Sequence, residues 1–331
     1  APTAAPAYFS LMSRESMSYR RLGQAGAKVS ALSLGGWTTF GSRVNEQEQI
    51  AAILREAYEA GITFFDIADV YARGEAERVM GAVLKQFPRH ELVISSKVFW
   101  PMSDDVNDRG LSRKHIVESI DKTLLRVGTD YLDVYFCHRY DEDTPLEETA
   151  RAMEDLVRAG KILYWGTSEW SGAQLKNAHA IADRRNWAAP SVEQPQYSLL
   201  ARKRVDDEIA KATREAGMGL VVWSPLASGV LTGKYDDGIP QGSRLDRIDW
   251  LRTTFLTDDN RDRVKRFGAL ANELGVSRTK LALAWCLSRP GISSVITGAT
   301  TLAQLQENLG ALQVKITDDL GKKLDELFPP S

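Results

Sequence analysis

The sequence predicts a closed barrel of eight parallel strands, each followed by a helix. Eight short runs rich in Val, Ile, Phe and Tyr recur along the chain, and amphipathic segments separate them. The runs are continuously apolar rather than alternating, as in strands that are covered on both faces. This rhythm favours a (β/α)8 TIM barrel in the α/β class. A doubly wound open sheet is the alternative, but no G-x-G-x-x-G opens a helix early in the chain.

The candidate strands are short, and a hairpin precedes the first of them. In "SYRRLGQAGAKVSAL", Gly23 and Gly26 fall in the turn region, so we expect a β-hairpin that closes the bottom of the barrel. Extra helices are expected near the C-terminus. The eight strands are predicted at residues 31–37, 63–69, 91–97, 131–138, 162–168, 191–197, 219–225 and 293–299.

Two of the predicted helices carry recognisable ends. One begins after Ser112, a good N-cap residue, and ends at Gly128. The other is expected to have Thr144 as its N-cap and Pro145 at its first position. Glu147 lies three residues after Thr144, so the sequence predicts a capping box there.

Composition narrows the classes of partner. Lys and Arg number 42 against 44 Asp and Glu, for a net charge of −2. This balance, with the basic residues scattered, indicates neither a nucleic-acid partner nor attachment to an anionic membrane. The chain contains no apolar run close to the roughly 20 residues that span a bilayer, so membrane insertion is not expected.

We expect one domain over residues 17–331. Residues 1–16 make a poor signal peptide and are expected to be a vector-derived remnant or a disordered extension, with Met17 as the native start. Cys137 and Cys286 are predicted to be free thiols, which favours a cytoplasmic location. The segment 225–258 is long and rich in Gly and polar residues, and such a connection is usually functional or mobile.

Four ionisable residues fall where predicted strands end. Asp66 and Lys97 lie at the ends of the second and third strands, Tyr71 follows in the next loop, and His138 closes the fourth strand. Taken singly, such residues are usually caps, packing or solvated groups. Together, at the end of the barrel that holds active sites, they are candidate catalytic residues.

Their chemistry suits the reduction of a carbonyl group. Tyr71 can donate a proton to the oxygen, although the ordinary pKa of a phenol is about 10. A Lys97 ammonium nearby would lower that pKa, and Asp66 would hold the ammonium in place. His138 would bind the carbonyl oxygen and assist proton delivery.

At this point the sequence resembles the aldo-keto reductases, over residues 19–328. The stretches "FFDIADVYARGEAERVMG", "LGGWTTFGS", "GVLTGKYDDGIPQGSR" and "TPLEETARAMEDLVRAGKILYWGTSEW" are most similar to the potassium-channel β-subunit branch and its bacterial relatives. The family's catalytic tetrad falls on Asp66, Tyr71, Lys97 and His138. In animal channel subunits the fourth position resembles Asn, so His138 favours a working enzyme.

The resemblance implies a nicotinamide cofactor at the strand ends. A barrel reductase needs NADP(H) or NAD(H) to supply its hydride. Ser168 and Gln194 would bind the carboxamide, and Trp223 would stack on the nicotinamide, although Trp223 could instead be a core residue. A buried amide such as Gln194 needs partners. The remaining implied cofactor residues are Trp37, Ser224, Pro225, Leu226, Ser228, Lys234, Arg244, Gly298, Thr300, Gln304, Glu307 and Asn308.

Their expected roles differ along the nucleotide. Residues 224–244 would line the pyrophosphate and continue into a lid over the cofactor. Residues 298–308 would place a helix N-terminus at a phosphate, with Glu307 and Asn308 facing the adenine. Family habit, with Lys234 and Arg244, favours NADPH over NADH, although Lys234 could also be a solvated loop residue.

The substrate is expected to be a small aldehyde or ketone. Trp37 and Trp100 are the first choices for its pocket, and Thr38, Tyr140 and Trp170 are weaker ones. The spacing of Cys and His indicates no metal site, and His90, His115 and His179 are expected at the surface.

Two other functions stay open. One is a redox-sensing regulatory subunit, similar to channel β subunits, that binds NADP(H) with little turnover. The other, ranked lower, is a barrel hydrolase that uses Asp66 and a second carboxylate. The resemblance to the channel β-subunit branch also implies a homotetramer, although no feature of the sequence itself requires one.

Overall fold

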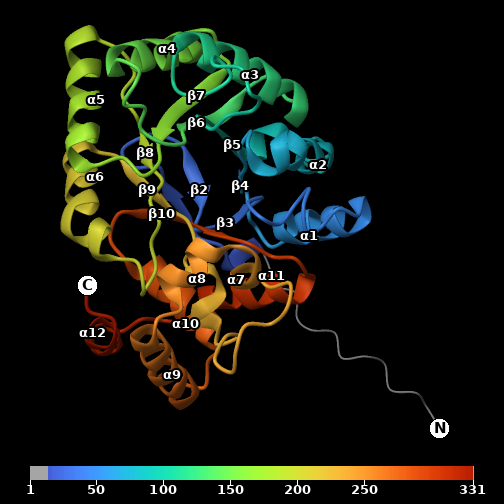
Figure 1. Cartoon of the computed structure of the whole chain (residues 1–331), viewed down its shortest axis with the longest axis vertical. Helices are drawn as coiled ribbons and strands as arrows, with labels where there is room; N and C mark the ends of the chain where they lie inside the picture. Colours follow the sequence, from blue (N-terminus) through green and yellow to red (C-terminus); the bar gives the residue numbers. More distant parts are fainter. Residues whose placement is uncertain (1–13, 331) are drawn as a thin grey trace.

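Eight parallel strands form a closed barrel in the computed structural model, which describes residues 14–330 (Figure 1). Their order around the barrel is β10-β3-β4-β5-β6-β7-β8-β9, as the sequence predicts for a TIM barrel. Each predicted run overlaps one strand, although β5 and β10 each extend one residue beyond the predicted run. The strands are β3 (Leu32–Gly35), β4 (Phe64–Asp66), β5 (Val93–Val98), β6 (Leu132–Cys137), β7 (Ile162–Thr167), β8 (Val192–Glu193), β9 (Gly219–Val222) and β10 (Ile292–Thr297).

Helices surround the barrel and connect successive strands (Figure 1). The helices between the strands are α1 (Gln47–Glu59), α2 (Glu75–Leu84), α3 (Arg113–Val127), α4 (Leu146–Arg158), α5 (Gly172–Arg185), α6 (Ala210–Ala216), α7 (Arg244–Arg247), α8 (Asp249–Phe255), α9 (Asp258–Glu273) and α10 (Arg278–Ser288). Two more follow β10, α11 (Leu302–Leu309) and α12 (Asp318–Leu327). Short 3-10 or π-helical turns lie at Arg14–Ser16, Tyr71–Gly74, Arg89–Glu91, Val205–Ile209, Ala227–Thr232 and Gly310–Gln313.

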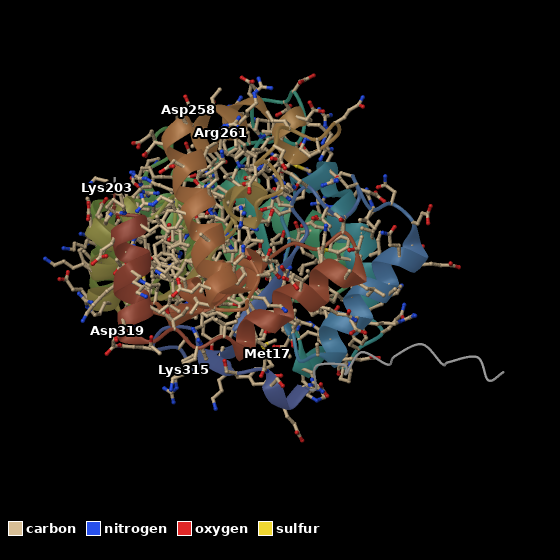
Figure 2. The ribbon with its side chains drawn as sticks, turned by 90° about the horizontal axis from the view of Figure 1, so that it is seen from below. Met17, Lys203, Asp258, Arg261, Lys315 and Asp319 are labelled. Carbon is tan, nitrogen blue, oxygen red and sulfur yellow. The ribbon has the colours of Figure 1, made fainter. Side chains whose placement is uncertain are left out.

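The core has two layers, which explains why the strands are apolar on both faces. On β6, Val134 and Phe136 belong to the cluster inside the barrel, whereas Tyr135 and Cys137 belong to the cluster between strands and helices. Alternate side chains of a strand point to opposite faces, so both sets are buried. Charged side chains such as Lys203, Asp258, Lys315 and Asp319 are exposed (Figure 2).

The predicted hairpin covers the N-terminal end of the barrel. β1 (Tyr19–Arg21) pairs antiparallel with β2 (Lys28–Ser30). In the turn, Gly23 has φ +61°, and a Cβ there would lie 2.4 Å from the carbonyl oxygen of Gly217. The turn therefore lies tightly against the segment that leads into β9, at the end of the barrel opposite the predicted catalytic residues.

Of the two predicted N-caps, one is confirmed and one is wrong. The Ser112 hydroxyl accepts a hydrogen bond from the His115 amide at 3.2 Å, and α3 ends at Gly128 with φ +75°. At α4 the N-cap is Pro145, and no side chain caps the helix. The Thr144 hydroxyl instead donates to Asp141 Oδ2 at 2.7 Å, so the predicted capping box does not form.

One of the three histidines expected at the surface is buried. His90 is exposed and His179 is partly buried, but the side chain of His115 is only 1% exposed. It lies on the inner face of α3 beside the Ser119 hydroxyl, and burial lowers its pKa. Helical periodicity places position 115 on the same face as buried Ser119, one turn further on.

Other expectations concern the ends of the chain and its thiols. Cys137 and Cys286 are free and buried, as predicted. Of the expected N-terminal extension, residues 14–16 form a 3-10 turn, and residues 1–13 lie outside the described part. None of the helices within residues 14–330 is long and apolar enough to cross a membrane.

Candidate active site

The four predicted catalytic residues converge at the C-terminal end of the barrel. Asp66 ends β4, Lys97 lies in β5, and His138 directly follows β6. Tyr71 begins the 3-10 turn after β4. The Lys97 ammonium lies 2.6 Å from Asp66 Oδ2 and 3.1 Å from the Tyr71 hydroxyl.

Lys97 is completely buried and its hydrogen bonds are satisfied. Besides Asp66 and Tyr71, its ammonium donates to the carbonyl oxygen of Ile67 at 2.7 Å. An ammonium has three N–H groups, so each has one acceptor. Asp66 is also held from its other oxygen, which accepts from the Ser95 hydroxyl at 2.7 Å and from the Gln194 amide at 3.0 Å. This network fixes the direction in which Lys97 meets the phenol.

Burial and charge compete at Lys97 and Tyr71. Burial lowers the pKa of Lys97, but the negative charges of Asp66 and the Tyr71 phenolate outweigh it, and the pKa is raised. Lys97 is therefore an ammonium near neutral pH. Burial raises the pKa of Tyr71, and the Lys97 charge lowers it by less. Lys97 thus acts in the predicted direction, but the expected net lowering is wrong: the phenol keeps its proton.

His138 forms one side of the same space. Its ring packs edge-on against Tyr71, with the ring centres 5.9 Å apart, and against Trp100 at 6.2 Å. Burial lowers its pKa well below the ordinary value, and the positive charges of Lys97 and Arg139 add to this. Its imidazole is therefore neutral, and its Nδ1 is buried without a partner. The ring can hydrogen-bond to a ligand but is a poor source of protons.

Aromatic side chains stand around this centre. Trp37 packs edge-on against Trp223 at 5.7 Å, and both rings are partly buried. Trp100 is 37% exposed beside His138. Trp170, one of the weaker candidates for the substrate pocket, is fully buried against Tyr140. Its side chain therefore cannot line an open pocket.

The two residues predicted to bind a carboxamide lie side by side. The Ser168 hydroxyl donates to the carbonyl oxygen of Gln194 at 2.8 Å, and the Gln194 amide donates to Asp66. Both side chains are buried. Gln194 therefore joins the predicted cofactor residues to the predicted catalytic residues through Asp66.

The segment after β9 presents unsatisfied polar groups. Ser224 and Ser228 have positive φ, and the Ser224 hydroxyl accepts from the Ser228 amide at 3.1 Å. Within the described residues, the hydroxyls of Ser228 and Ser243 are buried without a partner. Pro225 is buried, Leu226 is partly buried and Lys234 is exposed.

Arg244 approaches this segment without a carboxylate partner. Its guanidinium lies 5.5 Å from the centre of the Trp37 ring, and burial lowers its pKa to about 10. No carboxylate in residues 14–330 forms an ion pair with it. A cation beside buried, unpartnered hydroxyls suits a phosphate group.

The predicted residues around α11 are mostly satisfied by one another. The Thr301 hydroxyl caps the helix, and the Thr300 amide and hydroxyl both donate to Gln304 Oε1. The Asn308 amide donates to the carbonyl oxygen of Gly298 at 3.2 Å. Glu307 accepts from the Ser277 hydroxyl and lies 3.5 Å from the Lys280 ammonium.

Two residues of this region were not among the predicted site residues. Arg139 directly follows His138, and Ser243 directly precedes Arg244. Arg139 follows the end of a predicted strand, so its position was a usable signal. The burial of the Ser243 hydroxyl depends on how the loop folds, and the sequence carries no comparable signal for it.

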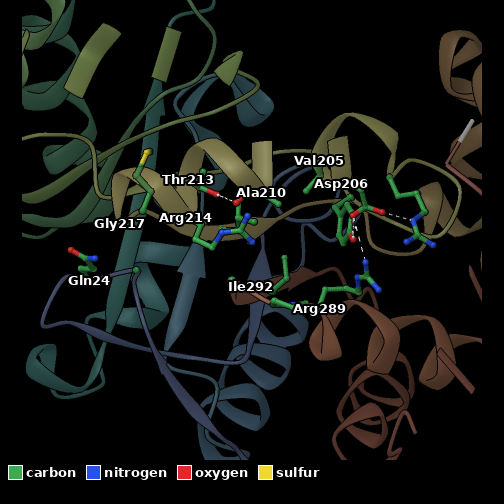
Figure 3. A pocket seen from close by; sticks show the side chains of 16 residues that line it. Gln24, Val205, Asp206, Ala210, Thr213, Arg214, Gly217, Arg289 and Ile292 are labelled. Carbon is green, nitrogen blue, oxygen red and sulfur yellow. Dashed lines mark hydrogen bonds and ion pairs between the residues drawn. The ribbon is translucent and has the colours of Figure 1, made fainter. Parts of the chain in front are cut away.

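A large cavity lies at the other end of the barrel. It has a volume of about 610 Å³, and its lining includes Gln24 of the hairpin, Leu220 and Ile292 from the starts of β9 and β10, and Arg289 (Figure 3). No tetrad residue lines it. We therefore place the candidate active site at Asp66, Tyr71, Lys97 and His138, and not at this cavity. Within residues 14–330, no group of three or more His, Cys, Asp or Glu could hold a metal ion.

The chain is similar over most of its length to known proteins that are named as potassium channel β subunits. The chain is 48% identical to a "Probable voltage-gated potassium channel subunit beta" of Arabidopsis thaliana and 47% identical to a protein of the same name in Oryza sativa subsp. japonica. Each alignment covers 90% of this chain and 92% of the relative. A "Putative voltage-gated potassium channel subunit beta" of Schizosaccharomyces pombe is 42% identical over 94% of this chain and 93% of its own length.

A family model matches almost all of the barrel, over residues 31–328. This span contains every barrel strand and all four residues of the predicted tetrad. The chain belongs to the aldo/keto reductase family.

Proposed function

We propose that this protein reduces aldehydes and ketones to alcohols with a nicotinamide cofactor. The observation that carries the proposal is the Lys97 ammonium, which bridges the Asp66 carboxylate and the Tyr71 hydroxyl at the end of the barrel where active sites lie. A hydrolase that used Asp66 and a second carboxylate would leave the contact between Lys97 and Tyr71 unexplained. Membership of the family supports the same class of reaction.

Tyr71 is the proton donor in this proposal. When bound, NAD(P)H supplies a hydride to the carbonyl carbon, and the oxygen then needs a proton. The Tyr71 phenol is protonated because burial raises its pKa, and the Lys97 ammonium 3.1 Å away stabilises the phenolate that remains. His138 is neutral and would donate a hydrogen bond to the substrate oxygen. Solvent returns the proton to Tyr71 after the product leaves.

Several groups fit the cofactor. Trp37 and Trp223 would flank the nicotinamide, and Ser168 and Gln194 would bind its carboxamide. The unpartnered hydroxyls of Ser228 and Ser243 would bind phosphate oxygens, as would Arg244. Arg244, together with the exposed Lys234, favours NADPH over NADH.

Tyr71→Phe tests the proposal. The variant should bind NADPH as the wild type does but lose about 10²–10⁴-fold in kcat for an aromatic aldehyde. Binding is measured by nucleotide fluorescence, and turnover by the loss of nicotinamide absorbance. Tyr131→Phe is the matched control, because Tyr131 directly precedes β6 at the opposite end of the barrel. Normal turnover in Tyr71→Phe would show that another group donates the proton.

A second function is favoured by the relatives, which are named as probable or putative voltage-gated potassium channel β subunits. The protein would then bind NADP(H) and regulate a channel through its redox state, with little turnover. Cofactor binding cannot separate the two functions, but rates can. Rapid oxidation of one equivalent of bound NADPH, followed by negligible steady-state turnover, would favour the regulatory subunit.

A further inference from the structure

Arg139 stands at the catalytic centre and is not used by the mechanism above. It directly follows His138, and its Nη1 donates to the carbonyl oxygen of His138 at 2.5 Å and to the Ser168 hydroxyl at 3.5 Å. The guanidinium carbon lies 5.6 Å from the centre of the Trp100 ring. The side chain is partly buried. A positive charge is therefore held between the predicted substrate wall and the predicted cofactor residues.

This charge has no counter-ion. Within residues 14–330, no carboxylate forms an ion pair with Arg139. Glu169 contributes to the local field, but its oxygens are already occupied. One accepts from the Gln196 amide at 2.6 Å and the Trp223 indole at 3.0 Å, and the other pairs with Arg204.

Glu193, the other acid in this field, does not compensate the charge either. Burial raises the pKa of Glu193 to about 8, so its carboxyl group is protonated near neutral pH. Its oxygens lie close to the Thr167 hydroxyl and the Trp170 amide. The fold thus keeps a partly desolvated guanidinium with which no carboxylate of residues 14–330 forms an ion pair.

A planar guanidinium binds carboxylates with two parallel hydrogen bonds. Within residues 14–330, the hydrogen bonds of Arg139 involve only Nη1, so Nη2 and Nε remain for a ligand. The Trp100 ring lies beside both the Arg139 guanidinium and His138, so one small molecule resting on this ring could reach both groups. A carboxylate on the substrate would meet Arg139 while its carbonyl group meets His138 and Tyr71.

We propose that Arg139 forms a carboxylate subsite and that the preferred substrates are aldehydes or ketones that carry a carboxylate. The proposal rests on the reductase function above and names its class of substrate. Arg139 determines specificity, and the proton still comes from Tyr71.

A matched pair of substrates tests the subsite. 4-Carboxybenzaldehyde and its methyl ester have similar rings and carbonyl groups and differ in charge. The wild type should prefer the acid, and Arg139→Gln should lose about 10- to 100-fold in kcat/KM for the acid, mainly through KM, since hydrogen bonds to charged groups have this strength. Values for the ester should stay near those of the wild type. Arg139→Lys keeps the positive charge but loses the planar group that makes two parallel hydrogen bonds. Its kcat/KM for the acid should lie between those of the wild type and Arg139→Gln.

Two controls separate a specific carboxylate subsite from a general attraction of anions. Arg109→Gln removes an exposed arginine from the loop after β5, so it reports general attraction of anions. Benzoate, but not benzamide, should inhibit the wild type competitively against the aldehyde, and this arm needs no variant. A wild type that reduces the ester as well as the acid would overturn the carboxylate subsite alone.

Equal losses for both substrates in Arg139→Gln, or weaker NADPH binding, would also overturn the subsite, since Arg139 would then serve Ser168 and the cofactor. If the wild type reduces neither substrate, the reductase function falls together with the subsite. A loss confined to the acid, with unchanged NADPH binding, would support it.

Discussion

Replacement of Lys97 by methionine separates two roles of the buried ion pair, stability and chemistry. The ammonium is fully buried 2.6 Å from Asp66 Oδ2. Methionine removes the charge and leaves the Asp66 carboxylate with the Ser95 hydroxyl and the Gln194 amide as its donors. Removal of one partner from a buried ion pair costs about 3–5 kcal/mol. We expect the free energy of unfolding to fall by that amount.

Asp66→Asn in the Lys97→Met background should recover most of the lost stability. Exchange of both partners for neutral groups of similar volume is often neutral, so the coupling between the two substitutions should reach about 2–4 kcal/mol. Turnover should not recover, because no ammonium remains to stabilise the Tyr71 phenolate. A variant that regains stability without activity would separate the two roles.

The assay is urea unfolding at pH 7, followed by tryptophan fluorescence, together with steady-state reduction of an aldehyde by NADPH. The coupling also requires the single variant Asp66→Asn, and Lys97→Met, Asp66→Asn and the double variant must all bind NADPH for the activities to be comparable. If Lys97→Met unfolds at the wild-type urea concentration, the pair is not the buried contact described here. If the double variant reduces aldehydes normally, Tyr71 works without an ammonium and the proposed mechanism is wrong.

Two further predictions concern stability. Because burial raises the pKa of Glu193 from 4.5 to about 8, the folded protein keeps a proton that the unfolded chain loses in this range. The contribution of Glu193 to the stability of the wild type should therefore fall by about 3–5 kcal/mol as pH rises from 4.5 to 8, and Glu193→Gln should not show this fall. Unfolding of both proteins at pH 5, 6.5 and 8.5 checks this, and a pH-independent difference would contradict it. A Cβ at Gly81 would lie 2.2 Å from the carbonyl oxygen of Val127, so Gly81→Ala should cost about 1–3 kcal/mol. In α12, Gly321→Ala meets no atom closer than 3.9 Å and should stabilise by about 0.5–1 kcal/mol; thermal unfolding of both variants tests the contrast.

The strands and the convergence of the four predicted tetrad residues could be predicted because both depend on short-range patterns. A strand buried on both faces needs a continuous apolar run, so a polar residue at its end, such as Asp66 or His138, stands out. The barrel topology then brings consecutive strand ends to one edge. The pairing of Asp66 with Lys97 follows from the adjacency of β4 and β5.

The errors arose where the outcome depends on a competing partner or on burial. Thr144 is a good cap residue, but the Asp141 carboxylate takes its hydroxyl. His115 is polar, but it lies on the inner face of α3. The net pKa of Tyr71 depends on how burial and the Lys97 charge balance, and no sequence pattern reports that balance. For Arg139, the informative fact is the missing counter-ion, which only the folded chain reveals.

The buried acidic side chains of this barrel differ in whether a buried cation lies beside them, and this difference is relevant to function. Asp69 and Glu193 are buried acids whose pKa is raised, so the fold can keep them neutral. Asp66 instead faces a fully buried ammonium, Lys97. Such a pair is rarely worth more to stability than an apolar pair of the same volume. Its presence is better explained by the third hydrogen bond of Lys97, which ends on the hydroxyl of Tyr71. A neutral replacement of equal stability would leave that phenol without a nearby cation, which is why stability and turnover should respond differently to the paired substitution.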